Sequence, residues 1–425
     1  MKRLKESFKN RNFFCLWLAQ IISQFGDRIN QMALIGLVAE RGLNSTFDLA
    51  KLLSFSIIPV FIVGPIAGVY VDRWDRRVTL FVCDFLRGFL VLSIPFLFIY
   101  RESMIPIYVI VFLVFSLSRF YVPAKMSIIP ELVPQTDLLM ANSLVSTTGM
   151  IAFVLGCLFG GLIVENLGSA GGFFWDAVTF FASGVLVLSI SLEIKKSFKT
   201  RELIRAGLKT SKEMIDVIHK SVMSEIKEGV SYLVNHKDIR FIISILFILF
   251  SAAGAVYVVI IVFIQKAFST ITRDLGFLAV FLGLGLFAGA ILYGRFGRKF
   301  SRIKTMFFCL ILGGLILMTF ASFVEYVHNF ALAALLASIL GFVVGPIMIA
   351  TNTVVHEVAD ERMLGKVFSS LEIVIHFAFL VSMLLSSFLA ERIGHFVILM
   401  SVGVIFAFVG LGGLLTYKKQ IVFKI

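Results

Sequence analysis

A stripe of polar side chains runs along the first long apolar stretch of the chain, residues 12–39. Its members are Gln20, Gln24, Asp27 and Gln31. Their spacings of four, three and four residues place them on one face of an α-helix. A carboxylate among apolar residues could exchange a proton, because burial makes its charged form costly. The alternative is a static ion pair between Asp27 and Arg28, or between Asp27 and a base on a neighbouring helix.

Two basic residues lie in another apolar stretch, residues 105–127. Arg119 could bind an anionic group, hold Asp27 in an ion pair, or form a purely structural pair. Lys125 follows six residues later, about 240° further around a helix, so the two basic side chains do not share a face. The long stem of Lys125 could carry its ammonium group to the membrane surface.

A carboxylate and an imidazole lie close together in the apolar stretch 364–390. Ser369, Glu372 and His376 are three and four residues apart, so they would share one helix face. Because histidine titrates near neutrality, this face could handle protons. A satisfied structural hydrogen bond is the alternative.

Twelve apolar stretches must position these residues. The chain has 425 residues, of which 59% are hydrophobic and 15% charged, whereas a soluble domain is about half apolar and about a quarter charged. Stretches of about 20 residues cross a bilayer core of roughly 30 Å as helices, and their continuous hydrophobicity excludes barrel strands. We therefore predict an all-α integral membrane protein with twelve transmembrane helices. The predicted spans are 12–39, 49–71, 78–100, 105–127, 139–165, 172–192, 240–265, 275–295, 304–324, 329–354, 364–390 and 395–417.

Positive charges indicate how the spans are oriented. Of the 39 Lys and Arg residues, 29 lie on one predicted face and six on the other. Lys and Arg collect on the cytoplasmic side, so both termini are expected in the cytoplasm of a bacterial-type cytoplasmic (inner) membrane. The net charge of +13 therefore does not require nucleic acid as a partner.

A basic polar segment, residues 193–239, divides the spans into two sets of six. We expect one six-helix bundle over residues 1–192 and a second over residues 240–425. Within the basic segment, residues 225–234 would form a short amphipathic helix on the membrane face.

Several other polar residues have simpler predicted roles. Asp84 and Arg87 at the inner start of span three, and Asp176 at the outer start of span six, are expected to be structural. The cysteines are Cys15, Cys83, Cys157 and Cys309. Because no two of them form a C-x-x-C pair, we expect buried free thiols without a disulfide framework or a zinc site.

A short charged turn separates the second span from the third. Its sequence, Gly-Val-Tyr-Val-Asp-Arg-Trp-Asp-Arg-Arg, contains Gly68, Asp72, Arg73 and Arg77. A damaged copy, residues 290–299, occupies the equivalent turn of the second half. This G-x-x-x-D-R-x-x-R-R spacing resembles the loop signature of the major facilitator superfamily of secondary transporters. The resemblance implies two pseudo-symmetric six-helix bundles, with a substrate site between them and alternating access to it.

The resemblance also implies a mechanical role for this turn. In the family, the residue at the position of Asp72 meets the start of span eleven, here near Gly365. The helix dipole favours a carboxylate there. Arg73 and Arg77 would add ion pairs that hold the cytoplasmic gate closed.

Three further stretches narrow the resemblance, residues 118–134, 141–144 and 228–240. Together they are similar to the branch that holds macrolide efflux pumps, the enterobactin exporter and the lysophospholipid transporter. For a lysophospholipid transporter, a Lys that follows Pro-Ala would be the natural phosphate contact. The resemblance gives this role to Lys125.

Glycines recur in span five. Gly156, Gly160 and Gly161 resemble the G-P-x-x-G-G signature of drug/proton antiporters, with Cys157 in the place of proline. Close helix packing explains these glycines without any further function. The same packing is expected of three small-residue pairs, Gly64/Gly68, Gly285/Gly289 and Gly341/Gly345.

The sequence contains neither a phosphate-binding loop for ATP nor a metalloprotease or nucleophile-elbow motif. We therefore predict no enzyme activity, no cofactor and no metal site. The favoured function is proton-coupled export of amphipathic or lipophilic small molecules of the drug or siderophore type. In this function Asp27 couples the proton, and Arg119 is its partner or a substrate contact. The other residues predicted to face the cavity are Gln24, Gln31, Lys125, Glu372 and His376.

Two alternatives stay open. A lysophospholipid flippase would use Lys125 and would not need a pH gradient. A membrane-embedded enzyme or receptor would need a catalytic cluster or a soluble signalling domain, and neither is visible in the sequence. The expected partners are a small amphipathic or lipid-like substrate, protons and membrane lipids, but no nucleic acid, and the family implies a monomer.

Overall fold

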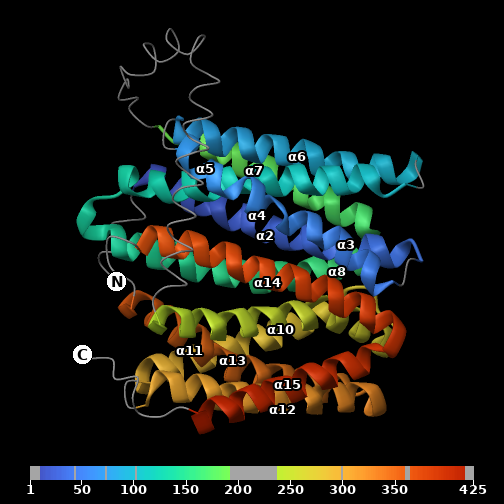
Figure 1. The fold of residues 1–425 in the computed structure, drawn as a ribbon. Helices are drawn as coiled ribbons and strands as arrows, with labels where there is room; N and C mark the ends of the chain where they lie inside the picture. The colour runs from blue at the N-terminus through green and yellow to red at the C-terminus, as the bar shows by residue number, and fades with distance from the viewer. Residues whose placement is uncertain are drawn as a thin grey trace. The chain divides into compact units, whose positions relative to one another are not determined.

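The computed structural model describes residues 10–42, 45–71, 74–100, 103–191, 237–297, 300–358 and 364–416. Every regular element in these ranges is a helix (Figure 1). The chain forms two compact units. The first unit comprises Met1–Arg28, Phe55–Phe153 and Phe173–Glu228. The second unit comprises Ile29–Ser54, Val154–Gly172 and Gly229–Ile425.

All twelve predicted spans are found as helices within the described residues. The first six are α2 (Arg11–Glu40), the series α3 (Thr46–Ile57), α4 (Pro59–Ile62) and α5 (Gly64–Val71), then α6 (Arg76–Tyr100), α7 (Ile105–Leu132) and both parts of α8 (Leu138–Leu188). The last six are α10 (Lys237–Phe268), α11 (Arg273–Phe296), α12 (Arg302–Val327), α13 (Phe330–Val358), α14 (Leu364–Ile393) and α15 (His395–Thr416). The predicted amphipathic helix at 225–234 lies outside the described residues.

Two spans differ from simple straight helices. The second span is divided into α3, α4 and α5, with Pro59 at the start of α4 and Pro65 at the second position of α5. Proline has no amide hydrogen and cannot continue a helical hydrogen-bond series. Spans five and six run together as α8, which changes direction at Gly168, where φ is 73°. A positive φ is readily adopted by glycine because it has no Cβ.

Among the described residues, nine helical segments are long and apolar enough to cross a membrane. The long α8 counts once, although it contains two spans. Neither α2 nor the divided α3–α5 series is among the nine. For α2, the polar stripe lowers the mean hydropathy, and each piece of the α3–α5 series is too short to span alone.

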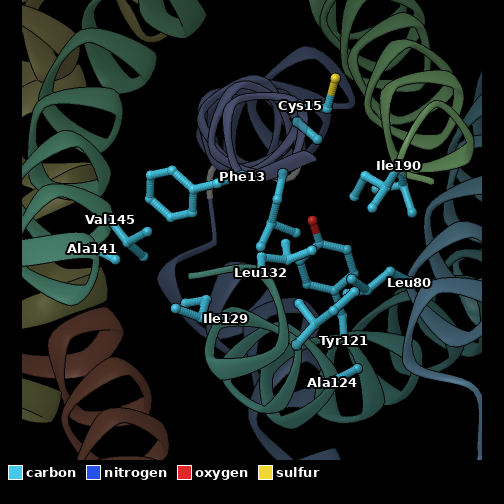
Figure 2. Packing of buried hydrophobic residues seen from close by; sticks show 14 of the residues in the cluster. Phe13, Cys15, Leu80, Tyr121, Ala124, Ile129, Leu132, Ala141, Val145 and Ile190 are labelled. Carbon is cyan, nitrogen blue, oxygen red and sulfur yellow. The ribbon is translucent and has the colours of Figure 1, made fainter. Parts of the chain in front are cut away.

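The core of the first unit gathers apolar side chains from the start of α2 and from α6, α7 and α8 (Figure 2). Phe13, Tyr121 and Leu132 are buried in it. Polar side chains join the ends of these helices. The Asn10 amide donates to the Leu132 carbonyl at 2.6 Å, and the Asn12 amide donates to the Ser191 carbonyl at 2.7 Å.

The second unit contains a closely packed pair of helices, α11 and α13. A Cβ added to Gly285 would lie 1.9 Å from the Ser338 carbonyl oxygen, and one added to Gly341 would lie 2.1 Å from that of Leu282. The helix backbones therefore touch, which confirms the predicted packing role of these glycine pairs. At Gly68, by contrast, an added Cβ would meet no atom within 4 Å in the described part of the chain. Close packing does not explain Gly68 in this structure.

The four cysteines are buried and free, as expected from their apolar surroundings.

Candidate functional site

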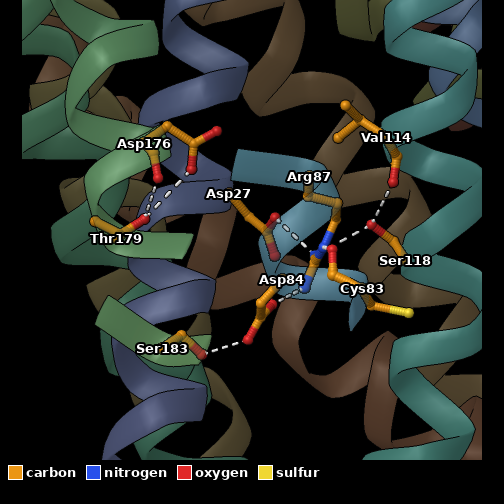
Figure 3. Close-up of polar contacts among 9 residues, drawn as sticks. All are labelled: Asp27, Cys83, Asp84, Arg87, Val114, Ser118, Asp176, Thr179 and Ser183. Carbon is orange, nitrogen blue, oxygen red and sulfur yellow. Dashed lines mark hydrogen bonds and ion pairs between the residues drawn. The ribbon is translucent and has the colours of Figure 1, made fainter. Parts of the chain in front are cut away.

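Asp27, the carboxylate of the predicted polar stripe, faces Arg87 of α6 (Figure 3). Asp27 Oδ1 lies 3.6 Å from Arg87 Nη1. The Arg87 side chain is 1% exposed, whereas that of Asp27 is 37% exposed. An accessible acid therefore lies at the edge of a fully buried base.

Arg87 also pairs with a second carboxylate, one helical turn away on α6. Its Nη2 donates to Oδ1 of Asp84, and the Asp84 side chain is fully buried. The other Asp84 oxygen, Oδ2, accepts a hydrogen bond from the Ser183 hydroxyl at 2.6 Å. Because both Asp84 oxygens have partners, this buried charge is compensated.

Aromatic rings complete the surroundings of the Arg87 guanidinium. Its carbon lies 4.6 Å from the ring centre of Tyr121 and 4.4 Å from that of Phe180. Arg87 Nη1 also donates to the Ser118 hydroxyl at 3.3 Å. Cation–π contacts in a desolvated site add attraction without adding charge. The base is thus held on several sides, while Asp27 approaches from a more open one.

The sequence predicts a structural role for Arg87 and Asp84 and offers Arg119 as a candidate partner for Asp27. In the structure the base that faces Asp27 is Arg87, and Arg119 is half-buried on α7. The spacing of Asp84 and Arg87 shows from sequence that they share a helix face. Their approach to Asp27 depends on the packing of α2 beside α6, which the sequence pattern does not specify.

The remaining members of the polar stripe have different surroundings. Gln20 is fully buried and donates to the Val145 carbonyl at 2.9 Å, so it joins α2 to α8. A Cβ added to Gly149 would lie only 2.5 Å from the amide oxygen of Gln24. Gln31, in the second unit, donates to the Tyr257 hydroxyl. Packing between helices, rather than a uniform cavity lining, accounts for Gln20.

The structure also places two other basic residues named in the sequence analysis, Lys125 and Arg28. Lys125 is 7% exposed, so its ammonium group is buried and does not extend to the membrane surface. The charges of Asp27 and Arg87 both act on it. Arg28 stacks on Phe153, with 4.4 Å between the guanidinium carbon and the ring centre. Because Lys125 lies within electrostatic range of Asp27 and Arg87, we group these residues with Asp84 and call them the charge cluster: Asp27, Asp84, Arg87 and Lys125.

The helix face predicted to carry Glu372 and His376 lies on α14, and its histidine forms a hydrogen bond within that helix. His376 Nδ1 lies 2.8 Å from the main-chain oxygen of Glu372, while Glu372 itself is exposed. This contact corresponds to the structural alternative. The side chain of Ser369 lies outside the described residues.

Asp176 is fully buried near the Thr179 hydroxyl, 3.4 Å from Oδ1 (Figure 3). An added Cβ on Gly26 would lie 2.6 Å from the same carboxylate oxygen. Asp176 therefore lies where α2 and α8 pack closely, which fits its predicted structural role.

The charged turn is only partly described, because Asp72 and Arg73 lie outside the described residues. Arg77 donates to the Leu188 carbonyl. Asp75 Oδ1 accepts the Val78 amide hydrogen at 3.0 Å and so caps the start of α6. The gate role of the turn stays a prediction.

Gly161 of span five meets α11 within the second unit. A Cβ on Gly161 would lie 2.7 Å from the Thr272 carbonyl oxygen, and one on Gly276 would lie 2.7 Å from that of Cys157. Gly156 and Gly160 are buried as well. The backbones of α8 and α11 are therefore in contact at this point.

Sequence comparison places these features in a known family. The model of the Major Facilitator Superfamily matches residues 16–262 and 241–420. The chain is 27% identical to the uncharacterized MFS-type transporter YkuC of Bacillus subtilis, over 85% of this chain and 81% of that protein. It is 22% identical to macrolide efflux protein A of Streptococcus pyogenes, over 90% of each chain. It is 24% identical to the multidrug efflux pump Tap of Mycolicibacterium fortuitum, over 82% of each chain.

Solved structures show the same fold at lower sequence identity. A bacterial homologue of the iron transporter ferroportin, in an inward-facing state, matches with a TM-score of 0.71 and 14% identity, over 95% of this chain and 98% of that one. A POT family transporter in complex with 5-aminolevulinic acid matches with a TM-score of 0.69 and 15% identity, over 95% and 96%. The family predicted from the charged turn is confirmed. The chain belongs to the major facilitator superfamily, as a multi-pass membrane transporter and not an enzyme.

Proposed function

We propose that this transporter is a proton-coupled exporter of amphipathic or lipophilic small molecules, and that Asp27 carries the coupled proton. The charge cluster is the observation that supports this proposal. One of its carboxylates, Asp84, is enclosed and fully hydrogen-bonded, whereas the other, Asp27, is partly accessible. Only the accessible carboxylate can take up and release a proton without breaking the buried pair.

The charges in the cluster explain how a proton and a substrate could be exchanged. When its four groups are ionised, the two carboxylates balance Arg87 and Lys125. A proton on Asp27 adds one positive charge, and a bound monocationic substrate adds the same charge. In a low-dielectric site, occupancy by both together is disfavoured by their mutual repulsion. The two ligands would therefore bind in turn, which is the requirement for antiport.

The relatives and the sequence support the direction of transport. Macrolide efflux protein A and the multidrug efflux pump Tap are efflux proteins by name, and both align over most of this chain. The excess of Lys and Arg on one face supports an inner-membrane orientation with both termini in the cytoplasm. Alternating access between two six-span halves, residues 1–192 and 240–425, would carry the substrate outward.

Transport in proteoliposomes tests this proposal. Purified protein is reconstituted, a pH gradient is imposed, and uptake of a radiolabelled macrolide and of a lipophilic cationic dye is followed. We expect Asp27→Asn to lose gradient-driven uptake by at least about tenfold, because the amide cannot bind a proton at neutral pH. Substrate exchange without a gradient should persist. The matched control is Asp137→Asn, a half-buried carboxylate that precedes α8. Undiminished gradient-driven uptake by Asp27→Asn would refute the assignment.

One observation favours a second candidate function, a lysophospholipid flippase. Lys125 follows Pro123 and Ala124 and is buried, so a phosphate that reached it would form a strong charge-assisted contact. This candidate predicts that a fluorescent lysophospholipid crosses the bilayer without a pH gradient and that Lys125→Ala abolishes the movement. If lysophospholipid movement is absent in the wild-type protein, this candidate is excluded.

A further inference from the structure

Two short sequence motifs occur once in each half of the chain at the same offset. Glu165-Asn166-Leu167-Gly168 and Glu391-Arg392-Ile393-Gly394 share the pattern E-x-x-G, 226 residues apart. Thr46-Phe47-Asp48-Leu49 and Thr272-Arg273-Asp274-Leu275 share the pattern T-x-D-L, also 226 residues apart. An equal offset is expected if the two halves are related by internal symmetry.

The structure places the paired motifs in equivalent positions. Gly168 and Gly394 both have a positive φ, 73° and 93°, and each follows a long helical stretch. Thr46 is the first residue of α3, and Thr272 immediately precedes α11. Each E-x-x-G motif therefore ends one span, and each T-x-D-L motif begins another.

Each glutamate caps a helix that belongs to the other half of the sequence. Glu165 Oε2 accepts the amide hydrogens of Ile271, Thr272 and Arg273 at 2.9, 2.8 and 3.1 Å. These are amides at the start of α11, which have no partner within the helix and lie at the positive end of its dipole.

The second glutamate makes the reciprocal contact. Glu391 Oε1 accepts the amide hydrogen of Phe47 at 2.9 Å and the hydroxyl hydrogen of Ser45, at the start of α3. We call these two sets of contacts the end caps, one formed by Glu165 and one by Glu391. All of their residues belong to the second compact unit.

The two threonines reinforce the end caps in the same way. The Thr272 hydroxyl donates to the Gly161 carbonyl at 2.9 Å, and the Thr46 hydroxyl lies 2.6 Å from His395 Nε2. Both threonines are fully buried. Each end cap thus has a carboxylate on helix amides and a threonine hydroxyl bonded back to the segment that supplies the carboxylate.

From this arrangement we propose that the two end caps together hold the two halves closed at the end of the spans predicted to face outside. Both must break when the substrate site opens to that side. This role deepens the proposed function, since it rests on alternating access between the halves. An end cap that closes the outer side should be strong enough to hold it and weak enough to open during each cycle. Loss of a helix cap changes such an equilibrium by roughly 2- to 30-fold, which meets both conditions.

The experiment measures the separation of the halves directly in the full chain. Spin labels are attached to cysteines placed at Asn166 and Arg392, the exposed second residues of the two E-x-x-G motifs, and their distance distribution is recorded in detergent. The native cysteines are buried, so labelling is selective. The variants are Glu165→Ala, Glu391→Ala and the double variant. Glu165→Gln and Glu391→Gln provide milder changes, because the amide oxygen still accepts hydrogen bonds without a charge.

The matched control is Glu40→Ala. Glu40 Oε1 accepts the Ser169 amide hydrogen at 2.7 Å, and its Oε2 accepts the Ser169 hydroxyl hydrogen at 2.5 Å. This carboxylate also caps a helix start, but both residues belong to the first half of the sequence. Its loss should therefore lower stability without separating the halves.

We expect each single Ala variant to raise the population of long distances by roughly 2- to 30-fold, and the double variant to raise it further. The Gln variants should lie between these and the wild type. An unchanged distribution in the double variant, or an equal change in Glu40→Ala, would overturn the proposal. If the Ala variants fail to fold, the distance distributions of the Gln variants test the proposal by the same outcomes. Because the measurement uses neither substrate nor pH gradient, its failure is distinct from failure of the transport assay.

Discussion

The charge cluster of the first unit and the end caps of the second unit use the same chemical group, a carboxylate, in different ways. In the charge cluster, Asp27 and Asp84 face the side chain of Arg87. In the end caps, Glu165 and Glu391 face backbone amides. A side-chain cluster changes its net charge when one member binds a proton, whereas backbone amides do not titrate. This difference is the basis of the two proposals, ion coupling by the charge cluster and mechanical closure by the end caps.

The largest effect on stability should come from breaking the buried pair of the charge cluster. Arg87→Leu leaves Asp84 as an uncompensated buried charge and should lower the free energy of unfolding by about 3–5 kcal/mol. Thermal unfolding in detergent measures this loss. The double variant Arg87→Leu/Asp84→Leu should recover most of it, because an apolar pair replaces the ionic one. Equal losses in the single and double variants would show that Arg87 contributes by packing alone.

A smaller effect is expected where the second unit relies on contact between backbones. Gly285→Ala places a Cβ 1.9 Å from the Ser338 oxygen, so α11 and α13 must separate, at a cost of about 1–3 kcal/mol. Gly294→Ala is the matched control on the same helix, since an added Cβ there meets no atom within 4 Å in the described part of the chain. The control should be neutral or slightly stabilising. Thermal unfolding of the two variants compares them, and similar melting temperatures would contradict the close contact.

The smallest effect should come from a cap that lies within one half of the sequence. Glu40→Ala removes the carboxylate that bonds Ser169, and the expected loss is about 1 kcal/mol. Hydrogen exchange of the amides that follow Gly168 should accelerate locally, and pH-gradient-driven transport should stay near the wild-type rate. A loss of proton coupling in this variant would contradict the separation of roles between carboxylates that cap helices and the charge cluster.

Much of the fold could be predicted because bilayer thickness imposes a length on every span. All twelve spans lie, within the described residues, where the sequence predicts them, and the glycine pairs of α11 and α13 mark a true close contact. The division of span two is explained by Pro59 and Pro65, which a hydropathy average does not detect. The positive φ of Gly168 divides α8 into the two spans that hydropathy predicts on either side of it.

The candidate site could be predicted only in part. Asp27 is identifiable because a carboxylate in an apolar helix is costly. Its partner is not, since Arg87, Arg119 and Lys125 are all bases in apolar stretches, and their positions relative to α2 depend on how the helices pack. The end caps are not evident from the sequence because their carboxylates lie near span ends, where charged residues are common. The equal 226-residue offsets were the sequence signal that could have revealed them.

The central claim, that Asp27 exchanges a proton for substrate, is tested most directly by measuring proton release on binding. Detergent-solubilised protein in weakly buffered solution, with a pH-indicator dye, is mixed with a macrolide or a lipophilic cation that it binds. We expect the wild-type protein to release protons in proportion to bound substrate, and Asp27→Asn to bind the substrate without releasing any. Equal proton release from the wild type and from Asp27→Asn would contradict the account.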